Sequence, residues 1–541
     1  MVNMIMREKV FDILAVILIL ISVALLFADL SDNFLCNDEA FTAAVGRNVL
    51  QFGYPRAFDG TNLVYPYYPK LILEKSFLWI SDTWTQFYLV ALSFVIFGVS
   101  DWAARFPFVL SGVLTLILSY LFCRHYLRSK IAGIFSLLLL GTSVPFLLHS
   151  RQARYYGLVI ALCFAIFYCY HRVIEKKKGY ICLTALFVAL SWTNHAAFVP
   201  MFACTWLMAL FMDRKDIKWK KFISLSVVSV LFLGAWLYIW WPTFVYDSAE
   251  YPARLSLLQV KKNLEFQLRT INNYFMPVAF WALFMLFLRI FKKREVFGLS
   301  ATEKKVLKRI LTVLLCNVAF FTLFGMRTMR YYVQYLPFLY LIEAVLLLKL
   351  FKWKKYPTIV IFLLLIFTNF LSRPNPLFLT KGLPGKFDVS EHSKFRTYFP
   401  DYLYELTHEY TGPTEALCGY LKSNAKPGDR IKIIKGDLQV IFYNPELTVI
   451  NDARYYKKTY PEWIVMRKYW NPIYEDVWGR GMEIDIEAGY LDVLDRYEKI
   501  ALPAVDSIRE NEPDNMETHF FRAPVITPEN QMCVYRLKEK S

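Results

Sequence analysis

Two adjacent acids, Asp38 and Glu39, follow the first long apolar run of the chain, in the segment FLCNDEAFTAAVGRNVLQFGYP at residues 34–55. A carboxylate at the mouth of a membrane cavity can act as a general base, because it can take the proton of a substrate hydroxyl. Helix capping is the simpler hypothesis, since Asn37 and Asp38 are favoured N-cap types and acids stabilise the first helical turn. Both hypotheses stay open here, because one side chain could serve both purposes.

Two further stretches combine arginine with tyrosine, LLHSRQARYYGL at 147–158 and GMRTMRYYVQYLPF at 325–338. Their candidate binding residues are Arg151, Arg154, Tyr155, Arg327, Arg330 and Tyr331. Arg151 and Arg154 are three residues apart, so we expect them to share a helix face. One arginine at the end of a membrane span is usually an anchor at the lipid interface. Two such stretches on the same side of the membrane as Asp38 favour an anionic lipid substrate.

Several classes of site have no motif in this chain. It contains no G-x-x-x-x-G-K or G-x-G-x-x-G loop, which argues against an ATP-driven transporter and a dinucleotide enzyme. It contains no C-x-x-C pair and no H-E-x-x-H that would suggest zinc. Glu483, Asp485 and Glu487 alternate and could hold a divalent metal, but such alternation is more typical of the solvated face of a strand. We predict no metal ligands and leave the need for a divalent metal open.

The elements that must position these residues are membrane helices. The chain has 541 residues, 56% of them hydrophobic, and its long apolar runs indicate a polytopic α-helical membrane protein. The formal charge is +17, and basic residues cluster in the short connections after every second apolar run, as cytoplasmic loops do. We therefore expect the lipid bilayer, and no nucleic acid, as the partner of these cations, with the N-terminus in the cytoplasm.

We predict about eleven spans, at residues 10–30, 105–123, 131–149, 155–171, 179–194, 196–212, 222–241, 274–291, 309–325, 331–350 and 357–372. An odd number of spans places everything after Arg373 outside. The segment at 84–99, within a long outer loop at 31–104, is short and suits a helix at the interface. The expected domains are a transmembrane domain at 1–372 and an outer soluble domain at 373–541.

The outer domain has the alternating pattern of a small α/β module. TEALCGYLKSNA predicts an amphipathic helix, and RIKIIKG and LTVI predict strands. Cys418 and Cys533 both fall in this domain. A disulfide between them is one open alternative, because the compartment outside the membrane is oxidising.

Four stretches in a fixed order resemble the GT-C superfamily of membrane glycosyltransferases: NDEAFTAAVGRNVLQFGYP, LSFVIFGVSDWAARFPFVLSG, SRQARYYGL and RYYVQYLPF. The chain is most similar to the branch of dolichyl-phosphate-mannose protein mannosyltransferases and the lipid A aminoarabinose transferase, over residues 1–372. The resemblance implies that Asp38 is the general base with Glu39 beside it. It also implies a polyprenyl-phosphate sugar as the donor.

One stretch departs from this family. Many relatives have Lys-Pro-Pro ahead of the interfacial helix, with the lysine near the donor phosphate. This chain has SDTWTQFY there, with Asp82 at about the position of that lysine. The phosphate must then be bound by other cations, and the candidates are Lys70, Lys75 and the four arginines named above.

The resemblance thus implies an inverting glycosyltransferase of the cell membrane. It would move a hexosyl or pentosyl group from a polyprenyl-phosphate donor to an acceptor hydroxyl on the outer face. The acceptor stays open between a lipid, a polysaccharide and a protein.

A membrane transporter or flippase of a polyprenyl-linked or glycolipid substrate is the main alternative. Its signature would be charges deep inside several spans. Glu343 is one such candidate, although its side chain could instead point towards Lys349. A surface binding protein would not need eleven spans as its anchor. A metal-dependent enzyme of the oligosaccharyltransferase kind would need a firmer cluster of outer acids than this sequence offers.

Overall fold

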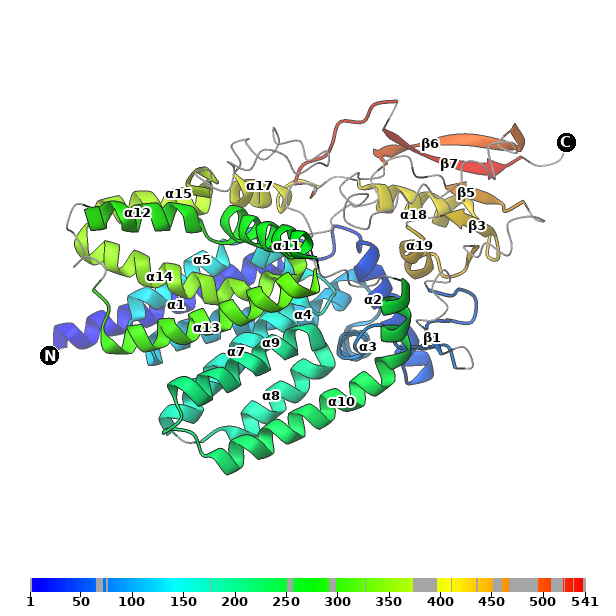
Figure 1. Ribbon diagram of the computed structural model, residues 1–541. Helices are drawn as coiled ribbons and strands as arrows, with labels where there is room; N and C mark the ends of the chain where they lie inside the picture. The colour runs from blue at the N-terminus through cyan, green and yellow to red at the C-terminus, as the bar shows by residue number, and fades with distance from the viewer. Residues whose placement is uncertain are drawn as a thin grey trace.

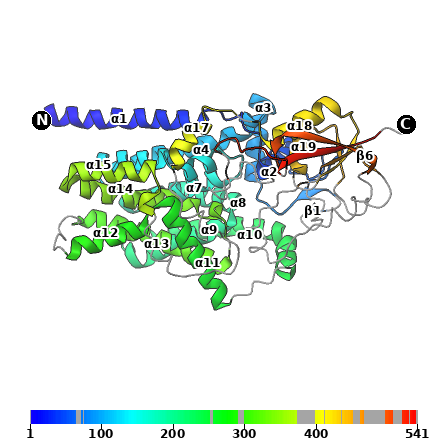
Figure 2. The ribbon, with the colours of Figure 1, turned by 90° about the horizontal axis from the view of Figure 1, so that it is seen from above.

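The computed structural model describes residues 2–64, 72–73, 76–176, 178–250, 256–290, 298–325, 327–372, 397–409, 411–433, 436–450, 460–465, 467, 495–506, 519, 521–528 and 530–538, without the side chains of residues 2–8, 73 and 242–250. Figure 1 shows a body of helices with the N-terminus at one end and the strands with the C-terminus at the other. Figure 2, seen from above, keeps the same arrangement. The sheet therefore lies beyond the ends of the helices.

The described residues contain seven helices that are long and apolar enough to cross a membrane. They are α1 (Val2–Phe27), α4 (Asp101–His125), α7 (Tyr156–Lys176), α9 (His195–Leu207) with η2 (Met208–Met212), α10 (Trp219–Glu250), α13 (Ala301–Phe324), and η6 (Val333–Tyr335) with α14 (Leu336–Trp353). The polytopic helical class is thereby confirmed.

Two further spans are bent, which brings the total among the described residues to as many as nine. These pairs are α5 (Lys130–Gly141) with α6 (Val144–Arg151), bent by 64°, and α11 (Leu257–Thr270) with η3 (Ile271–Phe275) against α12 (Val278–Ile290), bent by 81°. The two remaining predicted spans, at 179–194 and 357–372, coincide with α8 (Tyr180–Thr193) and α15 (Lys355–Phe367). Each is about 20 Å long, shorter than a hydrocarbon core of about 30 Å.

The bends correct two predicted boundaries. The straight span at 131–149 is broken because Ser143 caps a new helix, its Oγ accepting the amide of Phe146, and Pro145 lies in the first turn. The span expected at 274–291 begins instead at the bend after η3, and α11 precedes it. The apolar count missed α11 because its inward face is polar, with Asn263 and Gln267 buried.

The C-terminal strands form a five-stranded sheet in the order β4-β3-β5-β7-β6. Its members are β3 (Arg430–Ile433), β4 (Thr448–Val449), β5 (Trp463–Val465), β6 (Tyr497–Val505) and β7 (Gln531–Leu537), with α17 (Tyr398–Glu405), α18 (Pro413–Asn424) and α19 (Asp437–Tyr443). β3 pairs in parallel with β4 and β5, and β7 pairs antiparallel with β5 and β6. The predicted α/β character is confirmed. Cys418 and Cys533 are both buried and do not form a disulfide.

The loop after α1 contains α2 (Asn37–Phe52), the hairpin of β1 (Ile72–Leu73) and β2 (Leu78–Trp79), and α3 (Thr85–Phe97). α3 is a short apolar helix within the segment expected at 84–99, and it packs against α2. Figure 1 shows α2 and α3 at the same end of the helical body as the sheet. The sheet region contacts this loop directly, because Arg47 of α2 donates to the carbonyl oxygens of Ile441 at 3.0 Å and Phe442 at 3.1 Å.

The position of the sheet relative to the membrane can be tested by cysteine labelling in a Cys182→Ser background, since Cys182 is an exposed cysteine. Ser423→Cys lies at the end of α18, and Lys215→Cys lies in a basic connection. We expect an impermeant maleimide to label Ser423→Cys in intact cells and Lys215→Cys only after the inner membrane is permeabilised, because basic loops stay in the cytoplasm. The opposite pattern would invert the orientation.

Candidate active site

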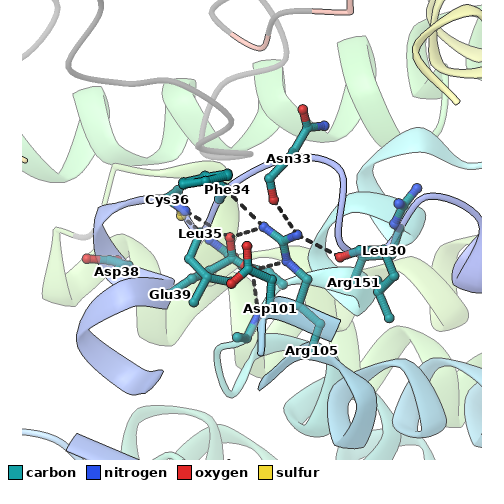
Figure 3. Close-up of polar contacts among 12 residues, drawn as sticks. Leu30, Asn33, Phe34, Leu35, Cys36, Asp38, Glu39, Asp101, Arg105 and Arg151 are labelled. Atoms are coloured by element: carbon teal, nitrogen blue, oxygen red, sulfur yellow. Dashed lines mark hydrogen bonds and ion pairs between the residues drawn. The ribbon is translucent and has the colours of Figure 1, made fainter. Parts of the chain in front are cut away.

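A buried ion pair joins Arg105 of α4 to Glu39 of α2 (Figure 3). Nε and Nη2 of Arg105 each donate to one carboxylate oxygen of Glu39 at 2.8 Å. The guanidinium also donates to the carbonyl oxygens of Leu30 at 2.8 Å, Asn33 at 2.7 Å and Phe34 at 3.4 Å. All five donors of the guanidinium therefore have an acceptor, which fixes the loop before α2 against α4.

The Glu39 carboxylate accepts two further bonds, from the backbone amides of Ala153 at 2.8 Å and Cys36 at 3.1 Å. Burial by itself would raise the pKa of Glu39. The charge and hydrogen bonds of Arg105, together with these amides, lower the pKa below its usual value. Glu39 is thus ionised, and four donors from its surroundings occupy its oxygens.

The same contacts correct the capping hypothesis. Helix α2 begins at Asn37, so Cys36 occupies the N-cap position and neither Asn37 nor Asp38 caps the helix. The Glu39 side chain bonds the Cys36 amide instead, three residues back, as the acid of a capping box does. Asp38 is therefore not needed to cap α2.

The sheet region reaches this ion pair through Tyr443, at the end of α19. Its hydroxyl donates to Asp101 Oδ2 at 2.7 Å and accepts the amide of Leu35 at 2.7 Å. Asp101 is in the first turn of α4, and Leu35 belongs to the loop that Arg105 holds. Tyr443 thus bonds α4 and the loop that Arg105 holds before α2.

Asp38 points away from this ion pair (Figure 3) and towards a separate group of charges. Its Oδ2 is 2.8 Å from Arg330 Nη1 and 3.7 Å from Arg154 Nη2. Arg154 Nη2 is in turn 3.8 Å from Asp82 Oδ1. We call Asp38, Asp82, Arg154 and Arg330 the Asp38 cluster. It joins α2, the segment between β2 and α3, the α6–α7 connection and η5 (Met329–Tyr331).

The electrostatics of the Asp38 cluster are strongly coupled. Burial raises the pKa of Asp82, and the charge of Asp38 adds to this, while Arg154 opposes both. Burial alone would lower the pKa of Arg154, but Asp38 and Asp82 raise it well above the usual value. Arg154 is therefore a permanent cation between two carboxyl groups.

A small cavity of about 10 Å³ lies beside Arg330, and both predicted tyrosines, Tyr155 and Tyr331, line it. The Arg154 guanidinium lies 5.3 Å from the centre of the Tyr155 ring, and that of Arg330 lies 5.4 Å from Tyr331. The structure thus brings together Asp38, Arg154, Arg330 and the two tyrosines.

Two predicted arginines lie elsewhere. Arg151 donates to the Tyr402 hydroxyl and to the Ala28 carbonyl, both at 2.6 Å. It shares no helix face with Arg154, because α6 ends at Arg151 and the chain becomes extended before Ala153 bonds Glu39. Arg327 donates to Asn263 Oδ1 at 2.8 Å. Lys70 and Lys75 lie outside the described residues.

Asp82 is the member of the cluster to which sequence reasoning gave no role. The signal was present, since an acid stands about where relatives have a lysine, but its partner Arg154 is far away in the sequence. Within the described part of the chain, no three His, Cys, Asp or Glu side chains gather as metal ligands. The acids at 483–487 fall outside it.

Comparisons with known proteins bear on the fold and on part of the sequence. A model of the dolichyl-phosphate-mannose-protein mannosyltransferase family matches residues 83–241. An uncharacterized protein of Aquifex aeolicus (strain VF5) is 26% identical over 226 residues, which covers 39% of this chain and 43% of that protein. ArnT from Cupriavidus metallidurans in the apo state has a TM-score of 0.54 at 12% identity, with 98% of each chain covered. The same protein bound to undecaprenyl phosphate has a TM-score of 0.51 at 12% identity, again with 98% of each chain covered.

The chain is thus a multi-span membrane protein, and its fold is similar to that of ArnT from Cupriavidus metallidurans. Its sequence resembles the mannosyltransferase family over residues 83–241, so the predicted resemblance is confirmed. This range contains Arg105 and Arg154 but neither Asp38 nor Arg330. At 12% identity, the similarity to the solved structures establishes the fold alone.

The buried ion pair predicts a large effect of Glu39→Gln on stability. The substitution leaves the charge of Arg105 buried without an anion, and breaking such a pair typically costs about 3–5 kcal/mol. We expect a marked fall in the thermal unfolding midpoint of the purified protein, whereas Glu409→Gln, an exposed site, should behave as wild type. An unchanged midpoint for Glu39→Gln would show that the pair is not needed for folding.

Proposed function

We propose that this protein is a polyprenyl-phosphate-dependent glycosyltransferase, which transfers a hexosyl or pentosyl group with inversion to an acceptor hydroxyl outside the membrane. The family model and the GT-C fold support this class. The observation that carries the proposal is the position of Asp38, one carboxylate held at 2.8 Å and 3.7 Å by two guanidinium groups. The site thus has a proton acceptor directly beside two phosphate-binding cations.

The donor phosphate binds at Arg154 and Arg330 in this proposal. Guanidinium groups match the oxygens of a phosphate with two parallel hydrogen bonds. Three buried polar atoms next to these residues have no hydrogen-bond partner among the described residues: Arg154 Nε, Tyr156 Oη and Gln334 Nε2. Tyr156 and Gln334 line the cavity beside Arg330. Each of the three atoms can donate a hydrogen bond, which suits an anionic ligand rich in acceptor oxygens.

Asp38 is the general base. When Arg330 turns to the donor phosphate, the Asp38 carboxylate is released to accept the proton of the acceptor hydroxyl. The acceptor oxygen forms a bond to the anomeric carbon as the bond from that carbon to the phosphate oxygen breaks. The electron pair leaves with the phosphate, and Arg154 and Arg330 stabilise the charge that grows there. The products are the glycosylated acceptor and the polyprenyl phosphate.

Glu39 has a different role in this scheme. Its oxygens are occupied by Arg105 and by two backbone amides, so it does not reach the substrate. We propose that Glu39 positions Asp38 by fixing the first turn of α2. The residues at 1–372 then form the catalytic membrane domain and those at 373–541 the outer domain. A lipid, a polysaccharide and a protein all remain candidate acceptors.

The two arginines of the cluster can be tested with undecaprenyl phosphate as the probe. Arg154→Gln and Arg330→Gln should each weaken its binding on the order of 10-fold to 100-fold, because a hydrogen-bonded charge is removed. Lysine at either position should restore binding only in part, since a bidentate fork becomes a point charge. Arg327→Gln is the matched control. Wild-type affinity in both cluster variants would place the phosphate elsewhere.

Asp38→Asn tests the base. Asparagine keeps the shape but cannot take the proton, so we expect transfer from a synthetic undecaprenyl-phosphate sugar to fall on the order of 10²-fold to 10⁴-fold. Folding should be retained, because α2 is capped by Glu39 rather than Asp38. Asp32→Asn, an exposed acid of the same loop, is the control and should keep full activity. Complementation of a deletion strain serves as the assay until the sugar is identified. A folded and fully active Asp38→Asn enzyme would remove Asp38 from the mechanism.

A further inference from the structure

A second cavity lies inside the helical body, between the two bent spans. The break between α5 and α6 forms one wall, and the break between η3 and α12 forms another. α14, which packs against α5 and α15, closes it together with the start of α17 (Figure 1). The cavity has a volume of about 90 Å³, and its polar lining includes Thr142, Ser143, Asn273, Tyr340, Glu343 and Ser372.

Glu343 is the charged residue of this lining. Glu343 is 1% exposed. Its carboxylate accepts one hydrogen bond, from Trp281 Nε1 at 2.7 Å. The expectation that it could turn towards Lys349 is wrong, because Lys349 pairs with Glu303 at 2.7 Å. No described lysine, arginine or histidine lies within ion-pair distance of Glu343. A carboxyl group at this depth is costly unless something compensates it.

The helix ends at this cavity add to its negative character. α5, η3 and α15 all end at the lining. The last carbonyls of a helix carry a partial negative charge, and at these three ends the carbonyls of Leu138, Ile271 and Leu364 each already accept a following amide. The amides of the helices that follow the two breaks are already occupied. Ser143 Oγ accepts the Phe146 amide at 3.4 Å, and Asn272 Oδ1 accepts the Ala279 amide at 3.0 Å. The start of α17 also lies at this lining. The hydroxyl and amide groups of the lining can accept as well as donate, so each of them can turn an oxygen towards a cation.

We propose that this cavity binds a compact monovalent cation, with Glu343 as its counter-ion. None of the residues that line it is a lysine, an arginine or a histidine, in contrast to the Asp38 cluster. Broken helices whose carbonyl ends meet near a carboxylate inside the membrane suit a cation and disfavour a phosphate. The same chemistry fits a free inorganic ion and the ammonium group of a lipid headgroup.

This site is separate from the proposed sugar transfer. α6 begins at the cavity, at Val144, and ends at Arg151, about 12 Å further along. A bound cation would fix the two bends relative to each other and hold the start of the helix that leads to Arg154. Its occupancy can therefore be measured without any assay of catalysis.

The test uses the purified full-length protein, kept in N-methyl-D-glucamine chloride, whose cation is too large for the cavity. Thermal unfolding is then followed at constant ionic strength with NaCl, KCl or ammonium chloride. In a second arm, native mass spectrometry measures which lipid stays bound after reconstitution in equal parts of phosphatidylethanolamine and phosphatidylglycerol. Glu343→Gln removes the charge and keeps an acceptor for Trp281. Glu265→Gln on α11 is the matched control, because it makes the same change outside the cavity.

We expect a rise of a few degrees in the unfolding midpoint with at least one small cation, or preferential retention of phosphatidylethanolamine. Either effect should be lost in Glu343→Gln and kept in Glu265→Gln. A cation effect alone identifies a free ion as the ligand, and a lipid effect alone identifies the headgroup ammonium. The proposal is overturned if the wild type shows neither effect, or if Glu343→Gln shows the same effect as the wild type. Should Glu343→Gln fail to fold, Glu343→Asp keeps the charge and must retain the effect.

Discussion

The ion pair between Arg105 and Glu39 is the contact on which the end of the helical body beside the sheet depends. It is buried, bidentate and fully hydrogen-bonded, so neither charge is left without a partner. Arg105 also bonds the carbonyls of the loop before α2, and Glu39 bonds the amide of Ala153 between α6 and α7. One pair of side chains thus ties three parts of the chain, distant in sequence, into a single frame.

This arrangement explains why the neighbouring acids Asp38 and Glu39 can have different roles. Successive residues on a helix point about 100° apart, so burying Glu39 against Arg105 turns Asp38 towards Arg154 and Arg330. The turn that presents Arg154 is itself fixed, because the preceding Ala153 amide is bonded to Glu39. The distance between the proposed base and the proposed phosphate site is therefore set by the buried pair. Tyr443 extends this control to the sheet region, through Asp101 and Leu35.

The features that the sequence predicted are those with a local signal. Long apolar runs located most of the spans, and alternation located β3 and β4 in the sheet. The bends at Ser143 and before α12 were missed because hydropathy does not register a cap or a polar inward face. The role of Arg105 was missed because its partner is 66 residues away, although the stretch that contains it was recognised. Arg154 and Asp38 were found as candidates, but only the fold shows that Arg327 is not beside them.

The two polar regions of the helical body differ in the charges of their side chains, and this difference limits what each region can bind. The Asp38 cluster has two guanidinium groups and two carboxyl groups, whereas the inner cavity has Glu343 and no cationic side chain in its lining. In the proposed transfer, the proton moves to Asp38 while one negative charge moves to the departing phosphate. The total charge of the cluster with its substrates is therefore unchanged during the step. The charge only shifts, from the carboxylate to oxygens that face Arg154 and Arg330. A site at the end of the helical body can accommodate such a shift, because no new charge is buried during the step. Burying a new charge in a medium of low dielectric constant would cost much free energy.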